Sequence, residues 1–164
     1  MMIETQRLML YVLDARQIRL WTQDLPALEK ELDCSYQAEA LEDVFLTIVE
    51  GQAVLTEQNS DRYYWHSFWL FIRKSDRVVV GSADFKSGPN INGEVEIGYG
   101  LGKAFEGCGY MTEAVSAMCD WALGQDGILH VTAETELNNY PSQHVLQRCG
   151  FIETRRNGTL WWKR

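Results

Sequence analysis

The stretch that decides the fold runs from Glu94 to Ala114 and reads EVEIGYGLGKAFEGCGYMTEA. Its first part is patterned as a strand, its last part as a helix, and glycines lie between them. A strand, a glycine-bearing loop and a helix in this order aim free backbone N–H groups and the positive end of the helix dipole at one point. Such a point binds phosphate or pyrophosphate. Gly107 and Gly109 let the backbone approach a ligand closely, although a Gly-x-Gly pair is also common in simple turns.

A dinucleotide-binding fold is the obvious competitor for this loop. It requires Gly-x-Gly-x-x-Gly and then an acidic residue at the end of the next strand. The third glycine would fall at Thr112, and Asp126 lies before its strand rather than at its end. The dinucleotide interpretation is therefore disfavoured.

Outward from this stretch, the apolar spacing predicts an α/β domain over residues 1–164, with a mixed sheet and helices on its faces. Helices are expected at 14–23, stopped near Pro26, at 38–57 with one buried apolar face, at 110–123 and at 141–149. Strands are expected at 4–13, 67–73, 78–85, 93–101 and 128–135, and a pair from 151 onward joined by an Asn157-Gly158 turn.

Composition excludes several classes of function. The net charge of −8 argues against nucleic-acid binding and suits a cationic partner such as a protonated amine. The longest apolar run, 8–13, is too short to span a membrane, and the N-terminus does not have the pattern of a secretory signal. Four scattered cysteines and three scattered histidines indicate a reducing, cytoplasmic setting without a metal site.

Three blocks in the chain resemble the GNAT superfamily of N-acetyltransferases, and most of all its ribosomal-protein (RimJ/RimL-like) branch. Residues 106–111 are similar to the coenzyme-binding motif, with Glu106 in place of Gln or Arg and Met111 in place of a small residue. Residues 139–151 resemble the Asn-x-x-Ser helix that ends in Gly-Phe. Residues 4–10 resemble the opening Thr-x-Arg-Leu-x-Leu strand.

This resemblance implies the acyl-CoA N-acyltransferase fold, a twisted and mostly antiparallel sheet that splays at the cofactor strand. It implies acetyl-coenzyme A as co-substrate and a primary amine as acceptor, either a protein N-terminus or a small molecule, in a direct attack. The residues it implies for coenzyme binding are Ile97, Gly98, Tyr99, Gly100, Leu101, Glu106, Gly107, Cys108, Gly109, Tyr110, Met111, Thr112, Asn139 and Ser142, with Asn138 as the alternative to Asn139.

Catalysis needs a proton acceptor for the amine, an N–H for the oxyanion and a donor for the departing thiolate. Glu96 is the expected acceptor, directly or through water, with Glu94 in reserve, because both lie on one face of the cofactor strand. The resemblance assigns the oxyanion to the N–H near Tyr99. Many family members place a Tyr on the last helix for the thiolate, but Leu146 stands at that position here, so Ser142 becomes the candidate donor; its competing interpretation is a helix cap.

Two alternatives stay open at this level. The adjacent Trp161 and Trp162 face opposite ways on a strand, so one of them needs cover from a helix, a substrate or a second subunit, and a homodimer is among the expected partners. The missing Tyr and the unusual Glu106 also allow a non-catalytic module that binds coenzyme A as a sensor or scaffold.

Overall fold

The computed structural model describes all residues, 1–164, and its centre is one twisted sheet. The strand order is β1-β2-β4-β5-β6-β7-β9-β8, and β3 pairs with the first two residues of β5. Only the β6–β7 and β3–β5 pairs are parallel. The strands are β1 (Met2–Glu4), β2 (Leu8–Val12), β3 (Ser35–Tyr36), β4 (Phe68–Arg73), β5 (Val78–Phe85), β6 (Glu94–Leu101), β7 (His130–Glu136), β8 (Ile152–Asn157) and β9 (Thr159–Lys163).

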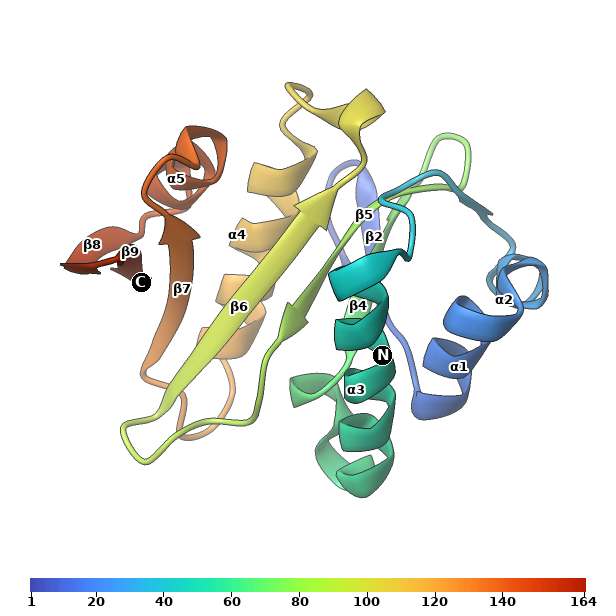
Figure 1. Cartoon of the computed structure of the whole chain (residues 1–164), viewed down its shortest axis with the longest axis horizontal. Helices are drawn as coiled ribbons and strands as arrows, with labels where there is room; N and C mark the ends of the chain where they lie inside the picture. The colour runs from blue at the N-terminus through green and yellow to red at the C-terminus, as the bar shows by residue number, and fades with distance from the viewer.

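Helices cover both faces of this sheet, as the sequence predicts (Figure 1). One face packs against α4 and α5 through a large apolar core, and the other packs against α1, α2 and α3 through a smaller one. The helices are α1 (Ala15–Gln23), α2 (Leu25–Leu32), α3 (Asp43–Gln58), α4 (Tyr110–Leu123) and α5 (Tyr140–Arg148), and two short 3-10 turns are η1 (Ser60–Trp65) and η2 (Lys103–Phe105). No helix combines the length and the hydropathy that crossing a bilayer requires.

The N-terminal half differs from the sequence prediction in three places. The single strand predicted at 4–13 is two strands, because the chain turns between Glu4 and Leu8 and β1 folds back on β2. The helix predicted to end at Gln23 does end there, but a second helix, α2, was not predicted; Pro26 lies in its first turn, where its missing N–H costs nothing. The helix predicted from residue 38 begins at Asp43.

The apolar face predicted for 38–57 is only partly buried. Val49 is fully buried, together with Gln52, Ala53 and Thr56, whereas Val44 and Ile48 are about half exposed or more. The buried stripe of α3 therefore contains a glutamine that the hydrophobic pattern did not place in the interior.

The C-terminal half follows the prediction closely. Helix α4 has the predicted bounds, and the turn between β8 and β9 contains Gly158 with φ +72°, the left-handed geometry that an Asn-Gly turn requires. Trp162 lies in the core, while Trp161 on the opposite face stacks under the guanidinium of Arg155 at 5.3 Å. Arg155 thus supplies part of the cover that Trp161 was expected to need.

Candidate active site

The sheet opens between β6 and β7. The two strands pair in parallel only from Glu94 to Glu96, opposite His130 to Thr132, and then diverge, as Figure 1 shows. On its other edge β6 stays paired with β5 as far as Leu101. The second half of β6 therefore has one free edge, which faces the gap.

The free edge exposes the backbone of alternate residues. Lys86 N donates to Glu96 O and Gly102 N donates to Val80 O, which fixes the phase of the antiparallel ladder. Gly98 and Gly100 thus turn their polar backbone groups toward β5, although the sequence interpretation had the whole segment 97–101 available to a ligand. The N–H and C=O groups of Ile97, Tyr99 and Leu101 point into the gap, where an extended ligand arm can pair with them as an added strand.

The glycine loop, residues 106–109, lies at the end of the gap where β6 and β7 have diverged, and α4 begins directly after it. Gly107 and Gly109 have φ values of +74° and +79°, which glycine adopts without strain. Gly109 is the N-cap of α4, and no side chain caps the helix, so the first N–H groups of α4 have no protein partner at that end. This geometry fits an anion such as a pyrophosphate.

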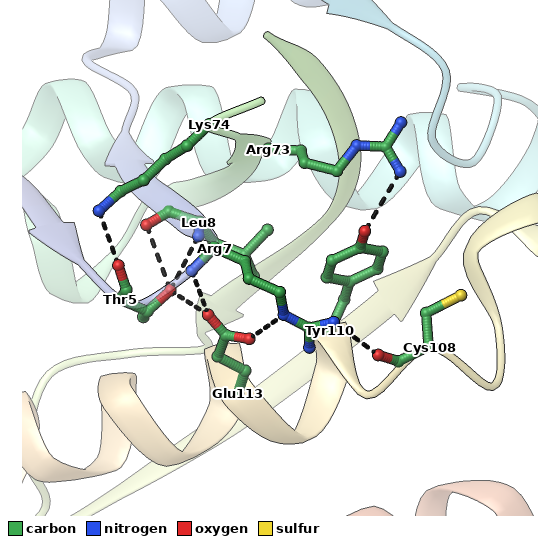
Figure 2. Close-up of polar contacts among 8 residues, drawn as sticks. All are labelled: Thr5, Arg7, Leu8, Arg73, Lys74, Cys108, Tyr110 and Glu113. Carbon is green, nitrogen blue, oxygen red and sulfur yellow. Dashed lines mark hydrogen bonds and ion pairs between the residues drawn. The ribbon is translucent and has the colours of Figure 1, made fainter. Parts of the chain in front are cut away.

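A latch from the N-terminal turn holds the loop in place (Figure 2). The carboxylate of Glu113 accepts hydrogen bonds from Thr5 Oγ1 at 2.6 Å and from Arg7 N and Arg7 Nε, both at 2.7 Å. Arg7 Nη1 then donates to the carbonyl of Cys108 at 2.9 Å, and its guanidinium stacks on the ring of Tyr110. The sequence interpretation missed this latch, although Glu113 in the first helical turn beside a glycine loop was the available signal.

A cavity of about 700 Å³ joins the free edge, the glycine loop and the start of α5. Its lining includes the predicted residues Tyr99, Gly100, Leu101, Glu106, Gly107, Gly109, Tyr110, Met111, Thr112, Asn139 and Ser142. Glu106 is exposed there. The other predicted residues do not line this cavity. Ile97 and Gly98 lie in β6, and Cys108 is an exposed free thiol in the loop. The side chain of Glu96 lies on the face of β6 opposite to those of Ile97 and Tyr99.

The start of α5 brings two hydroxyl groups together at the cavity wall. Ser142 Oγ lies 2.7 Å from the phenol oxygen of Tyr99, and either group can donate. Burial raises the pKa of Tyr99 to about 12, so its hydroxyl keeps its proton at neutral pH. Asn139, not Ser142, caps α5, since Asn139 Oδ1 accepts from Ser142 N at 3.2 Å. The Ser142 hydroxyl is therefore not the helix cap and has the Tyr99 hydroxyl as its partner, and Leu146 one turn later is fully buried.

The two glutamates of β6 have different partners. Glu94 binds Lys163 Nζ at 2.6 Å and Asn90 Nδ2 at 3.1 Å, and these two contacts lower its pKa, Lys163 most. Glu96 forms an ion pair with Lys86, whose Nζ lies 2.5 Å from Oε1, without the direction of a good hydrogen bond. Glu96 thus has one partner where Glu94 has two, and its side chain lies on the α3 face of β6.

Sequence and structure comparisons identify similar proteins. The model of a family described as acetyltransferase (GNAT) domain matches residues 12–152. YjdG of Bacillus subtilis, named as an uncharacterized N-acetyltransferase, is 30% identical over 152 residues, which cover 86% of this chain and 89% of YjdG.

Solved structures show the same fold at lower identity. RimL, a ribosomal L7/L12 alpha-N-protein acetyltransferase in complex with coenzyme A, has a TM-score of 0.69 and 19% identity, covering 100% of this chain and 97% of its own. A ribosomal-protein-S5-alanine acetyltransferase from Vibrio fischeri has a TM-score of 0.69 and 15% identity, covering 100% and 96%. The splayed, mostly antiparallel sheet expected from the resemblance is confirmed.

Proposed function

The chain belongs to the GNAT acetyltransferase family and is an acetyl-coenzyme A-dependent N-acetyltransferase, and we propose that it acetylates a primary amine, with a protein or peptide N-terminus as the first candidate. The observation that carries the proposal is the free edge of β6 beside the uncapped start of α4. One feature can pair with the pantetheine arm and the other with the pyrophosphate. The fold likeness to two ribosomal-protein acetyltransferases supports the N-terminal acceptor.

The residues of the cavity fit the coenzyme. Gly107, Gly109 and the first N–H groups of α4 would hold the pyrophosphate, and the backbone of Ile97, Tyr99 and Leu101 would hold the pantetheine arm. Asn139 stays a candidate for a further contact, through its amide nitrogen. When bound, acetyl-coenzyme A supplies an activated acetyl thioester.

The chain's own groups would then do three things. The N–H of Tyr99, which faces the gap, donates to the oxyanion that develops on the acetyl carbonyl. Glu96 accepts a proton from the attacking amine, directly or through one water. Ser142 donates a hydrogen bond to the departing thiolate, in the absence of a Tyr at the position of Leu146. The amine attacks the thioester directly, in a ternary complex of enzyme, acetyl-coenzyme A and acceptor.

The setting and the partners of the reaction complete the proposal. All four cysteines are free, which suits the reducing cytoplasm in which we place the enzyme. The acidic chain suits a cationic acceptor rather than a nucleic acid. A homodimer stays a prediction.

A thiol-release assay with a panel of amines tests this function. The panel contains peptides with free N-termini, the same peptides with blocked N-termini, a polyamine and free amino acids. We expect release of coenzyme A with free N-termini and little with blocked ones. Release only with a polyamine or amino acid would move the acceptor to the small-molecule class. Coenzyme binding without release for any amine would support the non-catalytic sensor.

A further inference from the structure

A buried carboxylate lies on the α3 face of the sheet, in β5, which pairs with the closed edge of β6. Asp84 in β5 is only 8% exposed and is the register partner of Gly98 in β6. A Cβ atom at residue 98 would lie 2.9 Å from Asp84 Oδ1. The carboxyl group therefore rests directly on the backbone of Gly98, and only glycine leaves it that room.

The position of Asp84 relates it to the proposed oxyanion donor. The peptide that joins Gly98 to Tyr99 turns its carbonyl toward β5 and its N–H toward the gap. Asp84 thus lies over the residue whose peptide bond carries the Tyr99 N–H. A nitrogen approaching the acetyl carbonyl from the α3 side would pass close to this carboxylate.

Only one of the two carboxylate oxygens of Asp84 accepts a hydrogen bond from another side chain. Gln52 Nε2, on the buried stripe of α3, donates to Asp84 Oδ2 at 3.1 Å and lies 3.4 Å from the carbonyl of Phe85. Oδ1 accepts no hydrogen bond from another residue. Oδ1 is not among the buried side-chain oxygens that lack a partner, so it keeps contact with solvent, and a ligand N–H can take the place of water on it.

Burial and the charges around Asp84 together set its pKa. Burial raises the pKa of Asp84 to about 6; Lys86 and the Gln52 hydrogen bond lower it, and Glu96 raises it. Gln52 from α3 is neutral, so Lys86 and Glu96 are the charged groups that act on it most. Glu39 faces Gly100 further along β6, 2.8 Å from where a Cβ there would lie. A carboxyl group that titrates near neutrality is well matched to proton transfer.

We propose that Asp84 receives the ammonium form of the acceptor amine and takes its first proton, directly or through one water. This inference rests on the proposed acetyltransferase function and adds a second carboxylate to it. An α-amine has a pKa of ~8 and a lysine amine ~10.4, so the acceptor arrives as an ammonium ion at neutral pH. Gln52 is the positioning residue that keeps Oδ1 turned toward Gly98.

The proton balance gives the two carboxylates separate roles. The ammonium nitrogen loses two protons in the whole reaction. Asp84 takes the first, which frees the nitrogen lone pair. Glu96 takes the second, as the N–C bond forms and the C–S bond breaks. One proton ends on the thiol sulfur and the other is released to solvent, so the reaction yields amide, thiol and one proton.

The test uses Asp84→Asn and Gln52→Leu in the full chain, with an amine that the wild type acetylates. At pH 7, Asp84→Asn should lower kcat/KM for the amine about 10²–10⁴-fold, the range of a lost proton acceptor. The Kd of acetyl-coenzyme A, measured by calorimetry, should stay close to that of the wild type. The rise of kcat/KM with a midpoint near pH 6 should disappear.

Gln52→Leu gives a readout that a structural role would not move. Gln52 stabilises the charged carboxylate, so its loss should shift the acidic limb of the pH profile to higher pH while the rate at high pH is largely kept. A ¹³C NMR titration of the Asp84 carboxyl group should show the same upward shift without any substrate. This second variant also serves if Asp84→Asn does not fold.

The failure of this inference is distinct from the failure of the proposed function. A wild type that binds acetyl-coenzyme A and releases no thiol with any amine would contradict both the proposed function and the role of Asp84. If the wild type is active and folded Asp84→Asn keeps the same kcat/KM and pH profile, the role of Asp84 alone is contradicted. An unshifted profile in Gln52→Leu would remove Gln52 as its positioning residue.

Discussion

Arg7 Nε lies 2.7 Å from Glu113 Oε2, and this contact ties the turn between β1 and β2 to the first turn of α4 (Figure 2). The same arginine donates to the carbonyl of Cys108 inside the glycine loop. Two segments more than a hundred positions apart in the chain thus fix the loop that is proposed to hold the pyrophosphate. The geometry of that loop depends on the N-terminal hairpin as well as on its own glycines.

Glu113→Gln should weaken both the fold and coenzyme binding. Burial alone would raise the pKa of Glu113, but hydrogen bonds from Thr5 and Arg7 outweigh it and hold the pKa below its usual value. Loss of the charge should cost about 1.5–3 kcal/mol of unfolding free energy, the range for hydrogen bonds to charged groups, as urea unfolding would show. Glu153→Gln, which breaks the exposed pair with Arg156, is the control and should cost less than about 1 kcal/mol. Equal losses in the two variants would contradict the latch.

Gly109→Asp should abolish acetyl-coenzyme A binding, because it adds a negative charge where the pyrophosphate is proposed to lie. Gly158→Asp is a matched control, since Gly158 has φ +72° against +79° for Gly109 and lies in the β8–β9 turn away from the cavity. Both variants place an aspartate at a residue with positive φ and add the same charge. Calorimetry should therefore show lost affinity only for Gly109→Asp. Unchanged affinity in a folded Gly109→Asp protein would show that the loop is not the phosphate site.

Glu96→Gln should lower turnover about 10²–10⁴-fold near neutral pH, because the amide keeps the shape of the side chain and cannot accept a proton. High pH should restore part of the rate, since hydroxide then takes the proton that Glu96 is proposed to accept as the N–C bond forms. Steady-state rates from pH 6 to about pH 10 measure this. Glu94→Gln is the comparison, because Lys163 and Asn90 already engage Glu94. Wild-type turnover in Glu96→Gln at pH 7 would transfer the role to Glu94 or to water.

Asp84 should make the protein less stable as the pH rises. Its folded-state pKa of about 6 exceeds the ordinary value of 3.8, so its contribution to stability is fully present below about pH 4 and is lost as the pH rises through 6. The shift corresponds to on the order of 3 kcal/mol. Asp84→Asn should therefore gain stability relative to the wild type between pH 4 and pH 7, as urea unfolding at both values would show. Asp126→Asn, at an exposed turn, should show no such gain.

The sequence predicted the elements around the site because the periodicity there is strong and local. Helix α4 and the strand before it were placed within a residue, and the Asn157-Gly158 turn was found from two residues. The exceptions are also local in origin. Pro26 is a stop signal in most contexts, yet it opens α2, since a proline at the first helical positions lacks only an N–H that would be unpaired anyway.

The contacts to which we assign the chemistry of the site could not be predicted in the same way. Tyr99 meets Ser142 across 43 positions, and Gln52 meets Asp84 across 32. Neither pair follows from the period of a helix or a strand, because each depends on how two elements pack. The one available signal was Asp84 itself, the single charged residue of a strand that is otherwise mostly apolar, where burial without a partner is costly.

Ser142→Ala should lower kcat and leave acetyl-coenzyme A binding nearly intact. A hydroxyl held against a developing thiolate donates a hydrogen bond that strengthens as the charge builds, so its loss should cost roughly 2–4 kcal/mol of transition-state stabilisation. Tyr99→Phe is the companion variant. It removes the hydroxyl 2.7 Å from Ser142 Oγ, keeps the ring, and should lower kcat by a smaller factor.

The measurements are kcat, the Kd of acetyl-coenzyme A and the melting temperature of each variant. Asn139 already caps α5, so Ser142→Ala should leave the melting temperature close to that of the wild type. If Ser142 and Tyr99 act through one hydrogen-bonded unit, the double variant should be little slower than Ser142→Ala alone. A fall of binding and melting temperature in proportion to kcat would instead make Ser142 a structural residue of the helix start and leave the thiolate to solvent.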